Sequence, residues 1–341
     1  MSAVGQSQGS TKPSSTRVPR VRVQRRPVHG VLLLDKPIGL SSNDALQKAK
    51  WLLRAEKAGH TGTLDPLATG VLPLCFGAAT KFSQLHLDAD KTYETTVRLG
   101  VKTSTADAEG EVISERPITC TVGQVVEVLD RFMGPITQVP PMYSALKKDG
   151  KALYEYARAG ETVEREPRHV VIHDLELLDM QLDGDKPFLS LRVTCSKGTY
   201  IRTLGEDIAE ALGCGGHLSA LRRVGTGPFV AADCVTLEDL TAMDEPQREA
   251  RLMPVQSLLT DHTPVTLDAE NAGRFLSGVR RRGEWPDQDR VCVFGEQPPA
   301  LLGSAHVKAG ELIPGRLLSP LEIQQILERS PVNQPLLAEQ A

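Results

Sequence analysis

The chain has 341 residues, of which 40% are hydrophobic and 24% are charged. This composition is typical of a globular protein, and the length is enough for two domains with a buried core. No run approaches the roughly eighteen apolar residues of a membrane helix, and the first residues lack the apolar segment of a signal peptide. We therefore expect a cytoplasmic protein with no membrane partner.

The net charge of −4 is unevenly distributed along the chain. Residues 1–27 contain six basic side chains and no acidic one, so the rest of the chain carries −10. The segment is rich in Ser, Thr, Gln, Gly and Pro, which predicts a disordered basic arm. Such an arm is either a solvated tail or a source of phosphate contacts. Its cations are Lys12, Arg17, Arg20, Arg22, Arg25 and Arg26.

The six cysteines are scattered and form no C-x-x-C pair, which indicates reduced thiols. Cys214 and His217 are the nearest approach to a metal-ligand pair, but no partner cluster accompanies them. The sequence also has no Walker loop and no dinucleotide fingerprint. We expect neither a metal nor a cofactor.

The first predicted elements are a strand and a helix. An apolar run from His29 to Leu34 predicts a buried strand, which ends in a turn at residues 35–39. Ser41 or Ser42 then caps a helix. Its apolar positions fall at helical spacing: Ala45, Leu46, Ala49, Leu52 and Leu53.

Residues 58–74 combine three glycines, two prolines and a single carboxylate, that of Asp65. The prolines forbid one continuous helix, and the glycines permit unusual backbone geometry, so Asp65 is expected on a fixed loop facing a cleft. A second interpretation is open at this point. Asp followed by Pro is also how helices begin, with Asp65 as the cap and Pro66 in the first turn.

Alternating and helical patterns continue through the middle of the chain. Residues 92–99 predict a strand with Tyr93, Thr95 and Val97 on one face, and residues 103–110 predict a structured turn. Helices are expected at 122–132 and around 153–157. Strands at 169–178 and 188–195 are joined by Asp183-Gly184-Asp185, residue types that are typical of a hairpin turn. A turn at Gly198 leads into a helix that contains Leu204 and Ile208.

The last third of the chain is less regular. Residues 265–279 indicate a strand entry and a short helix, and an arginine run at 280–282 follows. Short apolar runs at 291–294 and 301–307, separated by Gly and Pro, favour a small β-barrel. Beyond about residue 320 one helix and a loose tail are expected.

Several of these stretches together resemble the TruB family, the bacterial tRNA pseudouridine-55 synthases. The longest is GHTGTLDPLATGVLPL at 59–74, and it is supported by DKPIGLSS at 35–42 and KTYETTVRLG at 91–100. Further matches are PPMYSALK at 140–147, KGTYIR at 197–202 and HLSALRR at 217–223. The resemblance therefore spans the chain from residue 35 to residue 223.

The resemblance implies a role for seven residues. Asp65 would be the catalytic aspartate, Arg202 its ion-pair partner, and Tyr93 the aromatic ring that stacks on a flipped uracil. Four others would contact the substrate or support the site: Lys36 beside the catalytic loop, His60 in the gap that the flipped base leaves, Tyr200 against the base, and Leu221 in the pocket wall. An aromatic face is the physical means of holding an unstacked base.

The need for an arginine follows from electrostatics. A carboxylate buried in a nucleobase pocket has its pKa raised by desolvation, and an adjacent guanidinium lowers that pKa by about 1–3 units. Arg202 would supply this charge.

The implied fold is the α+β pseudouridine synthase fold, with a mixed, mostly antiparallel central sheet. The expected domains are a basic arm at 1–27, a catalytic domain at 28–250, a PUA-like RNA-binding domain at 251–325 and a tail at 326–341. The implied reaction isomerises one uridine in the T-loop of tRNA. The tRNA T-stem-loop is the expected partner, and no obligate protein partner is evident.

Two other classes compete with this interpretation. A non-catalytic RNA-binding protein with the same fold would have replaced Asp65, Tyr93 or Arg202, and all three are present. An unrelated hydrolase that uses Asp65 with His60 would need a second carboxylate nearby, and the local sequence shows none. Product analysis of reacted tRNA separates the three classes.

Overall fold

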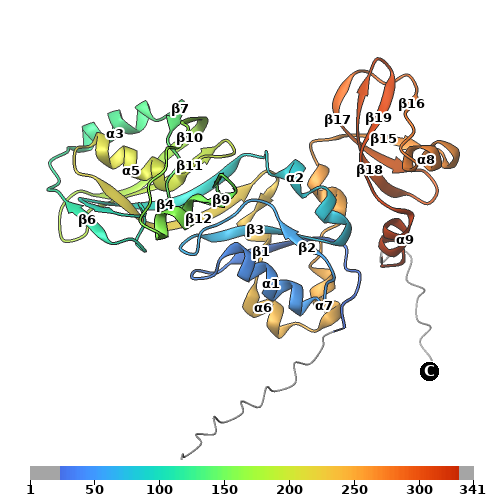
Figure 1. Ribbon diagram of the computed structural model, residues 1–341, viewed down its shortest axis with the longest axis horizontal. Coiled ribbons are helices and arrows are strands. Elements are labelled where there is room, and N and C mark those ends of the chain that lie inside the picture. Colours follow the sequence, from blue (N-terminus) through green and yellow to red (C-terminus); the bar gives the residue numbers. More distant parts are fainter. Residues whose placement is uncertain (1–23, 330–341) are drawn as a thin grey trace, which may run out of the picture.

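The computed structural model describes residues 24–329, so the predictions for most of the basic arm and for the end of the tail lie outside the described residues. A large mixed sheet forms the centre of the molecule (Figure 1). Its main path runs β14-β1-β3-β12-β4-β11-β10-β7, while β13 pairs with β12 and β2 pairs with β3. Within this sheet of residues 24–329, only the β1–β14 and β3–β12 pairs are parallel. The predicted mixed, mostly antiparallel sheet is confirmed.

The first half of this sheet is built from the apolar run near the start of the chain. Strand β1 (Gly30–Lys36) is buried along its length and pairs antiparallel with β3 (Thr69–Phe76). Helix α1 (Ser42–Leu52) begins at Ser41, whose hydroxyl accepts a hydrogen bond from the Asp44 amide. The strand and the helix predicted for this region are both confirmed.

The second half of the sheet is antiparallel. It contains β4 (Lys91–Leu99), β7 (Gly134–Gln138), β10 (Arg168–Gln181), β11 (Phe188–Cys195) and β12 (Gly216–Thr226). Helices α3 (Val122–Arg131) and α5 (Ile201–Ala211) lie on this half (Figure 1). The predicted hairpin of β10 and β11 and both predicted helices are confirmed.

Two of the strands that the sequence did not predict, β3 and β12, border the Asp65 loop. The chain becomes extended again at Thr69 and stays in β3 despite Pro73, a residue that normally argues against a central strand. Residues 216–226 form β12, although their glycines and polar side chains conceal the alternation of apolar and polar residues that is typical of a strand. The helix-cap interpretation of Asp65 is wrong, because residues 66–68 form a turn that leads directly into β3.

The two halves of the sheet meet at a short seam. Strands β3 and β12 pair over only two positions, Thr69 with Arg222 and Gly70 with Arg223. Gly70 has φ +99°, and a Cβ there would lie 2.1 Å from the carbonyl oxygen of Arg223. Only glycine permits this approach.

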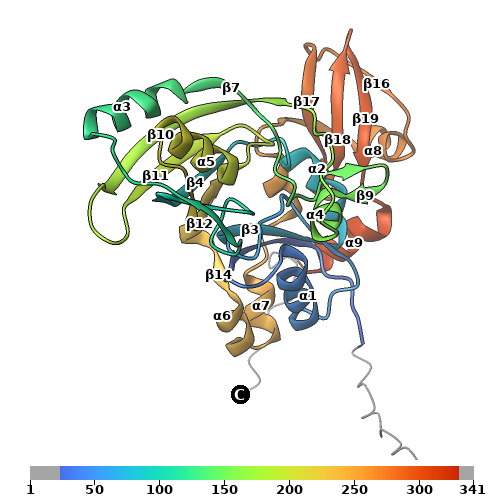
Figure 2. The same cartoon turned by 60° about the vertical axis from the view of Figure 1, so that its left-hand side comes forward.

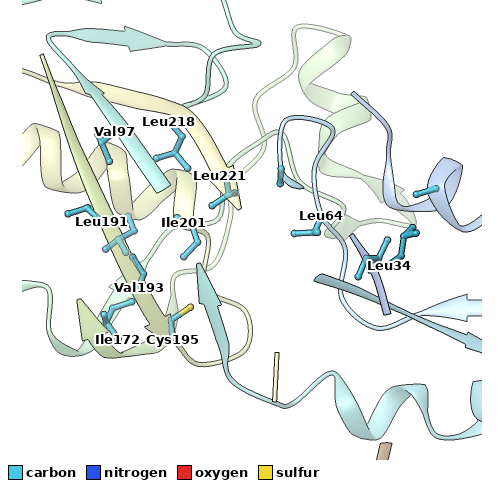
Figure 3. Close-up of a cluster of buried hydrophobic side chains, with 14 of the residues drawn as sticks. Leu34, Leu64, Val97, Ile172, Leu191, Val193, Cys195, Ile201, Leu218 and Leu221 are labelled. Atoms are coloured by element: carbon cyan, nitrogen blue, oxygen red, sulfur yellow. The ribbon is translucent and has the colours of Figure 1, made fainter. Parts of the chain in front are cut away.

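The main hydrophobic core crosses the seam. Figure 3 shows side chains of β4, β11 and β12 on one side of this core, and Leu34 of β1 with Leu64 of the Asp65 loop on the other. Leu64 and Leu221 are both buried in this cluster. The residue before Asp65 is therefore anchored by packing.

A second sheet follows in the C-terminal part of the chain, beside the first (Figure 2). Its order is β15-β17-β18-β19-β16. The strands are β15 (Thr263–Leu267), β16 (Arg281–Arg282), β17 (Gln288–Gly295), β18 (Ala300–Lys308) and β19 (Glu311–Leu317), with α8 (Ala269–Leu276) and α9 (Pro320–Arg329). This five-stranded unit agrees with the predicted small PUA-like barrel.

The remaining elements are short. They are β2 (Ala58–His60), α2 (Ser83–His86), β5 (Val101–Thr103), β6 (Val112–Glu115), β8 (Lys147–Lys148), β9 (Lys151–Ala152), α4 (Leu153–Arg158), β13 (Phe229–Val230), β14 (Val235–Thr236), α6 (Leu237–Ala242) and α7 (Glu245–Ala250), with 3-10 turns at Gly77–Lys81, Ala231–Asp233 and Val255–Leu259. Among residues 24–329, no helix has the length and apolar character needed to cross a membrane.

Candidate active site

A cavity of about 370 Å³ lies at the seam of the central sheet. Five of the seven predicted site residues line it: Asp65, Tyr93, Tyr200, Arg202 and Leu221. A larger groove of about 660 Å³ between α8, the β17–β18 turn and α9 has Glu328 as its one charged lining residue. A catalytic site needs convergent ionisable groups, so the seam cavity is the stronger candidate.

The loop that carries Asp65 is held from two sides. The Ser42 hydroxyl donates to the carbonyl of Leu64 at 2.9 Å and accepts from the Leu64 amide at 2.7 Å. On the other side, the Gly39 amide donates to the Pro66 carbonyl at 2.8 Å. Both contacts come from the 35–42 motif, so this motif positions the carboxylate. Ser42 was predicted only as a possible helix cap.

Asp65 forms an ion pair with Arg202. Its Oδ2 lies 2.8 Å from Nη2 of Arg202, and its side chain is 41% exposed toward the cavity. Burial raises the pKa of Asp65 above the ordinary value, and the charge and hydrogen bonding of Arg202 oppose that shift. Burial and the charge of Arg202 therefore act on the pKa of Asp65 in opposite directions, and that pKa remains raised.

Arg202 lies in the first turn of α5 and is held by backbone carbonyls. Its Nη2 donates to the Tyr143 carbonyl at 2.7 Å and its Nη1 to the Thr105 carbonyl at 3.1 Å. The side chain is 6% exposed. Two segments that are distant in sequence thus fix the guanidinium against Asp65.

Asp107 is a second carboxylate at this site, so the expectation that none lies near Asp65 is wrong. Its Oδ2 is 3.5 Å from Nη1 of Arg202, and its side chain is 4% exposed. Oδ1 accepts hydrogen bonds from the Thr105 hydroxyl and the Glu109 amide. Asp107 does not line the cavity. It therefore acts on Arg202 from behind, and its negative charge contributes to the raised pKa of Asp65.

The walls of the cavity are aromatic and aliphatic. Tyr93 comes from β4 and Leu221 from β12, where they occupy neighbouring strands. Tyr200 precedes α5, and its amide donates to the side chain of Gln138, which is buried at the end of β7. The guanidinium of Arg168 lies 5.5 Å from the Tyr200 ring. These surfaces suit a planar heterocycle.

The other two predicted residues lie outside the cavity lining. Lys36 is buried, and its Nζ donates to the carbonyls of Pro37, Leu40 and Pro66 at 2.9, 2.6 and 3.4 Å. Burial lowers the pKa of Lys36 to about 8.

His60 ends β2, where it pairs with Leu74 and is half-buried. Burial lowers its pKa, and the charge of Arg223 adds to that effect.

Two charged residues of the cavity lining were not predicted as site residues, Lys91 and Arg223. Lys91 donates to the carbonyls of Leu87 and Ala89. Arg223 donates through Nε to the Val71 carbonyl at 2.7 Å and through Nη2 to the Gly62 carbonyl at 3.3 Å. Strand alternation places Lys91 on the face of Tyr93, a signal that could have identified it.

Within residues 24–329, no group of three or more His, Cys, Asp or Glu side chains is arranged to hold a metal ion. His217 instead contacts the Val101 carbonyl through Nδ1 at 2.7 Å, and the Cys214 thiol contacts the Ala209 carbonyl. The cavity presents one carboxylate beside a buried guanidinium, facing aromatic surfaces, and a carboxylate so placed is able to act as a nucleophile.

Two family models match adjoining parts of the chain. Residues 50–201 match the TruB family pseudouridylate synthase N-terminal domain, and residues 202–260 match the tRNA pseudouridylate synthase B C-terminal domain. The chain belongs to the TruB family. As a TruB family member it is a pseudouridylate synthase, an enzyme that isomerises RNA.

Curated relatives within the TruB family are similar over most of their length. The tRNA pseudouridine synthase B of Verminephrobacter eiseniae is 63% identical over 318 residues, which cover 92% of this chain and 96% of that protein. The protein of the same name from Ralstonia pickettii is 60% identical over 312 residues, which cover 89% of this chain and 98% of that protein.

Solved structures share the fold. A Cbf5-Nop10-Gar1 complex matches with a TM-score of 0.64 and 25% identity, covering 86% of each chain. An H/ACA RNP bound to a substrate RNA that contains 2'-deoxyuridine matches with a TM-score of 0.63 and 24% identity, again over 86% of each. The TruB family chain therefore has the pseudouridine synthase fold.

Proposed function

We propose that this pseudouridine synthase acts on tRNA in the cytoplasm and converts the uridine at position 55 of the T-loop to pseudouridine. The observation that carries the proposal is the Asp65–Arg202 pair at 2.8 Å on a cavity with aromatic walls. The curated relatives carry the name tRNA pseudouridine synthase B, which supports tRNA as the substrate.

In this mechanism the target uridine leaves the stack and enters the cavity. A stacked base is out of reach of a carboxylate, and extruding it costs a few kcal/mol. Tyr93 and Tyr200 hold the extruded ring between them and Leu221 closes the wall. Lys36 supports the loop next to Asp65, and His60 fills the gap that the base leaves in the RNA.

Asp65 is the nucleophile in this proposal. It attacks C1′ of the sugar or C6 of the pyrimidine, the glycosidic bond to N1 breaks, the ring rotates and C5 bonds to C1′. The bond to Asp65 then breaks, and its electron pair returns to the carboxylate. The proton on C5 is released after the new bond forms. Arg202 keeps Asp65 ionised, because its positive charge opposes the effect of burial on the pKa of Asp65.

Release of tritium from tRNA labelled at C5 of uridine tests the proposal. The parent enzyme should release label from one uridine per tRNA, and a transcript with cytidine at position 55 should release none. Asp65→Asn should bind tRNA as the parent does and release no label, because the amide keeps the shape without the nucleophile. Label release by Asp65→Asn at the parental rate contradicts the role of Asp65, and release from the cytidine transcript contradicts the position.

A further inference from the structure

Four lysine and arginine side chains are buried in residues 24–329, and all four lie at or next to the seam cavity: Lys36, Lys91, Arg202 and Arg223. Arg202 alone among them has a carboxylate oxygen of the described chain within 4.0 Å. The other three are held by backbone carbonyls. A buried cation without a counter-charge is unfavourable unless a ligand supplies the charge.

Lys91 and Arg223 are the two of these cations that line the cavity itself. Lys91 is 8% exposed and Arg223 is 1% exposed. The Lys91 ammonium uses two of its three N–H groups on carbonyls. Arg223 donates to the Val71 and Gly62 carbonyls, and its side chain is also hydrogen-bonded to that of Tyr93. Among residues 24–329, one donor therefore remains unused on the buried Lys91 ammonium, and the buried charge of Arg223 lies near it.

We propose that Lys91, with Arg223 beside it, forms an anion-stabilising site for the pyrimidine ring during catalysis. This inference rests on the proposed function. It assigns Lys91 as a further catalytic residue that contacts the reacting base, and it assigns Arg223 the supporting charge.

The electron balance of the reaction calls for such a site. If Asp65 bonds to C1′, the C1′–N1 electron pair leaves with the pyrimidine and spreads from N1 onto O2 and O4. If Asp65 adds to C6, the C5–C6 π pair moves onto O4. Either route places a negative charge on the base before the C5 proton leaves. Fixed donors aimed at developing charge in a water-excluded site are the strongest form of electrostatic catalysis.

The surroundings of Lys91 support this assignment. Burial lowers the pKa of Lys91 to about 8, and the charge of Arg223 contributes to this shift. The ammonium is therefore charged at neutral pH and loses its proton as the pH rises past that value. The titratable and charged groups around it are Arg223 of β12, Cys195 of β11, and His86, Asp88 and Asp90 of the segment before β4.

Lys91 is the better residue to test because Arg223 also holds the seam of the sheet. Single-turnover rates on tRNA with saturating enzyme should fall about 100-fold in Lys91→Met, the size of effect seen when one such donor is removed. The affinity for tRNA should stay at the parental value, and Lys91→Arg should recover most of the rate. Lys186→Met, which removes an exposed lysine from the β10–β11 hairpin, is the matched control and should behave as the parent.

Two readouts distinguish stabilisation of charge from a structural role. The first readout is the pH–rate profile. The parental rate should fall as the pH rises through the pKa of Lys91. In Lys91→Arg this decrease in rate should occur at higher pH, and in Lys91→Met it should be absent. With 5-fluorouridine at the target position, the fluorine itself stabilises the anion. Lys91→Met should therefore slow the loss of nitrogen-linked 5-fluorouridine less than it slows the reaction of uridine.

Each contrary result has a separate meaning. If the parent is active and Lys91→Met reacts at the same rate, the inference is overturned while the proposed function stands. If Lys91→Met changes only the affinity for tRNA, Lys91 is a phosphate contact, and the inference is again overturned. Equal slowing of uridine and 5-fluorouridine identifies a structural role and also overturns it. A parent that releases no tritium overturns the proposed function and the inference with it.

Discussion

The two ends of the seam cavity differ in how their buried charges are balanced. At one end Arg202 lies between the carboxylates of Asp65 and Asp107, so the cluster is complete in the free protein. At the other end Lys91 donates to carbonyl oxygens, Arg223 bonds to carbonyl oxygens and to the Tyr93 side chain, and neither has a carboxylate within 4.0 Å among residues 24–329. In the proposed mechanism, the first end would keep Asp65 ionised before substrate arrives, whereas the second would acquire its counter-charge only during the reaction. Substitutions at the two ends should therefore change the reaction rate and its pH dependence in different ways.

The largest effect on rate is expected from Arg202→Met. Removing the guanidinium leaves Asp65 without its counter-charge and Asp107 buried without its ion-pair partner, so the pKa of Asp65 rises further. At neutral pH the rate should fall by about 100- to 1000-fold. Because a carboxyl with a raised pKa ionises only at higher pH, part of the loss should be recovered as the pH rises.

The pH–rate profile of tritium release measures this effect. Arg192→Met is the matched control, because Arg192 pairs with Glu94 and Glu176 on the exposed face of the sheet. A profile for Arg202→Met that parallels the parental one would contradict the electrostatic role and would assign Arg202 to positioning alone.

Gly70→Ala should disrupt both ends of the cavity together. The added Cβ would meet the Arg223 carbonyl at 2.1 Å, and backbone must move to relieve this contact. We expect a loss of more than about 3 kcal/mol of unfolding free energy, the range of severe backbone and packing defects. Thermal or denaturant unfolding measures it. Gly273→Ala in α8, where a Cβ meets nothing within 4 Å, should leave stability unchanged or raise it.

A smaller effect at the Asp65 end is expected from Asp107→Asn. Loss of this like charge lowers the pKa of Asp65, so the acid limb of kcat/KM should move to lower pH. The buried guanidinium loses one partner, which should lower the unfolding free energy by about 1–3 kcal/mol. Asp130→Asn on the exposed face of α3 is the control. An acid limb displaced to higher pH would show that Asp107 supports Asp65 by a route other than charge.

The smallest effect is expected from removing the basic arm, a change that should alter neither end of the cavity. Arg25 and Arg26 already contact the body of the protein: Arg26 pairs with Glu245 and Glu249, and Arg25 donates to the Lys50 carbonyl. Four cations of the arm remain for phosphate contacts, which at about 0.7–0.9 per contact limits the change in log–log salt slope to roughly three.

Deleting residues 2–22 tests this expectation. The truncated enzyme should bind tRNA more weakly, most of all at low salt, and its rate at saturation should match that of the parent. An unchanged salt slope would identify the arm as a solvated tail. The phosphate contacts would then belong to Lys147, Lys148 and Lys151 or to the 280–282 arginine run.

Much of the fold could be predicted because local patterns agree with the tertiary structure. Apolar periodicity indicated β1, α1, α3 and α5, and the turn residues at 183–185 indicated the β10–β11 hairpin. Motifs identified five side chains that share one cavity, although Asp65 and Arg202 lie 137 positions apart in the chain.

What only the tertiary structure decided is the arrangement at the seam. The approach of Gly70 to Arg223 depends on two strands that are distant in sequence, and no local pattern reports it. For the same reason Asp107, in a segment predicted only as a turn, could not be placed behind Arg202. The sequence alone determined which groups could perform the chemistry. Their pKa values and their charge balance depend on burial and on neighbours from other strands, so these properties required the folded chain.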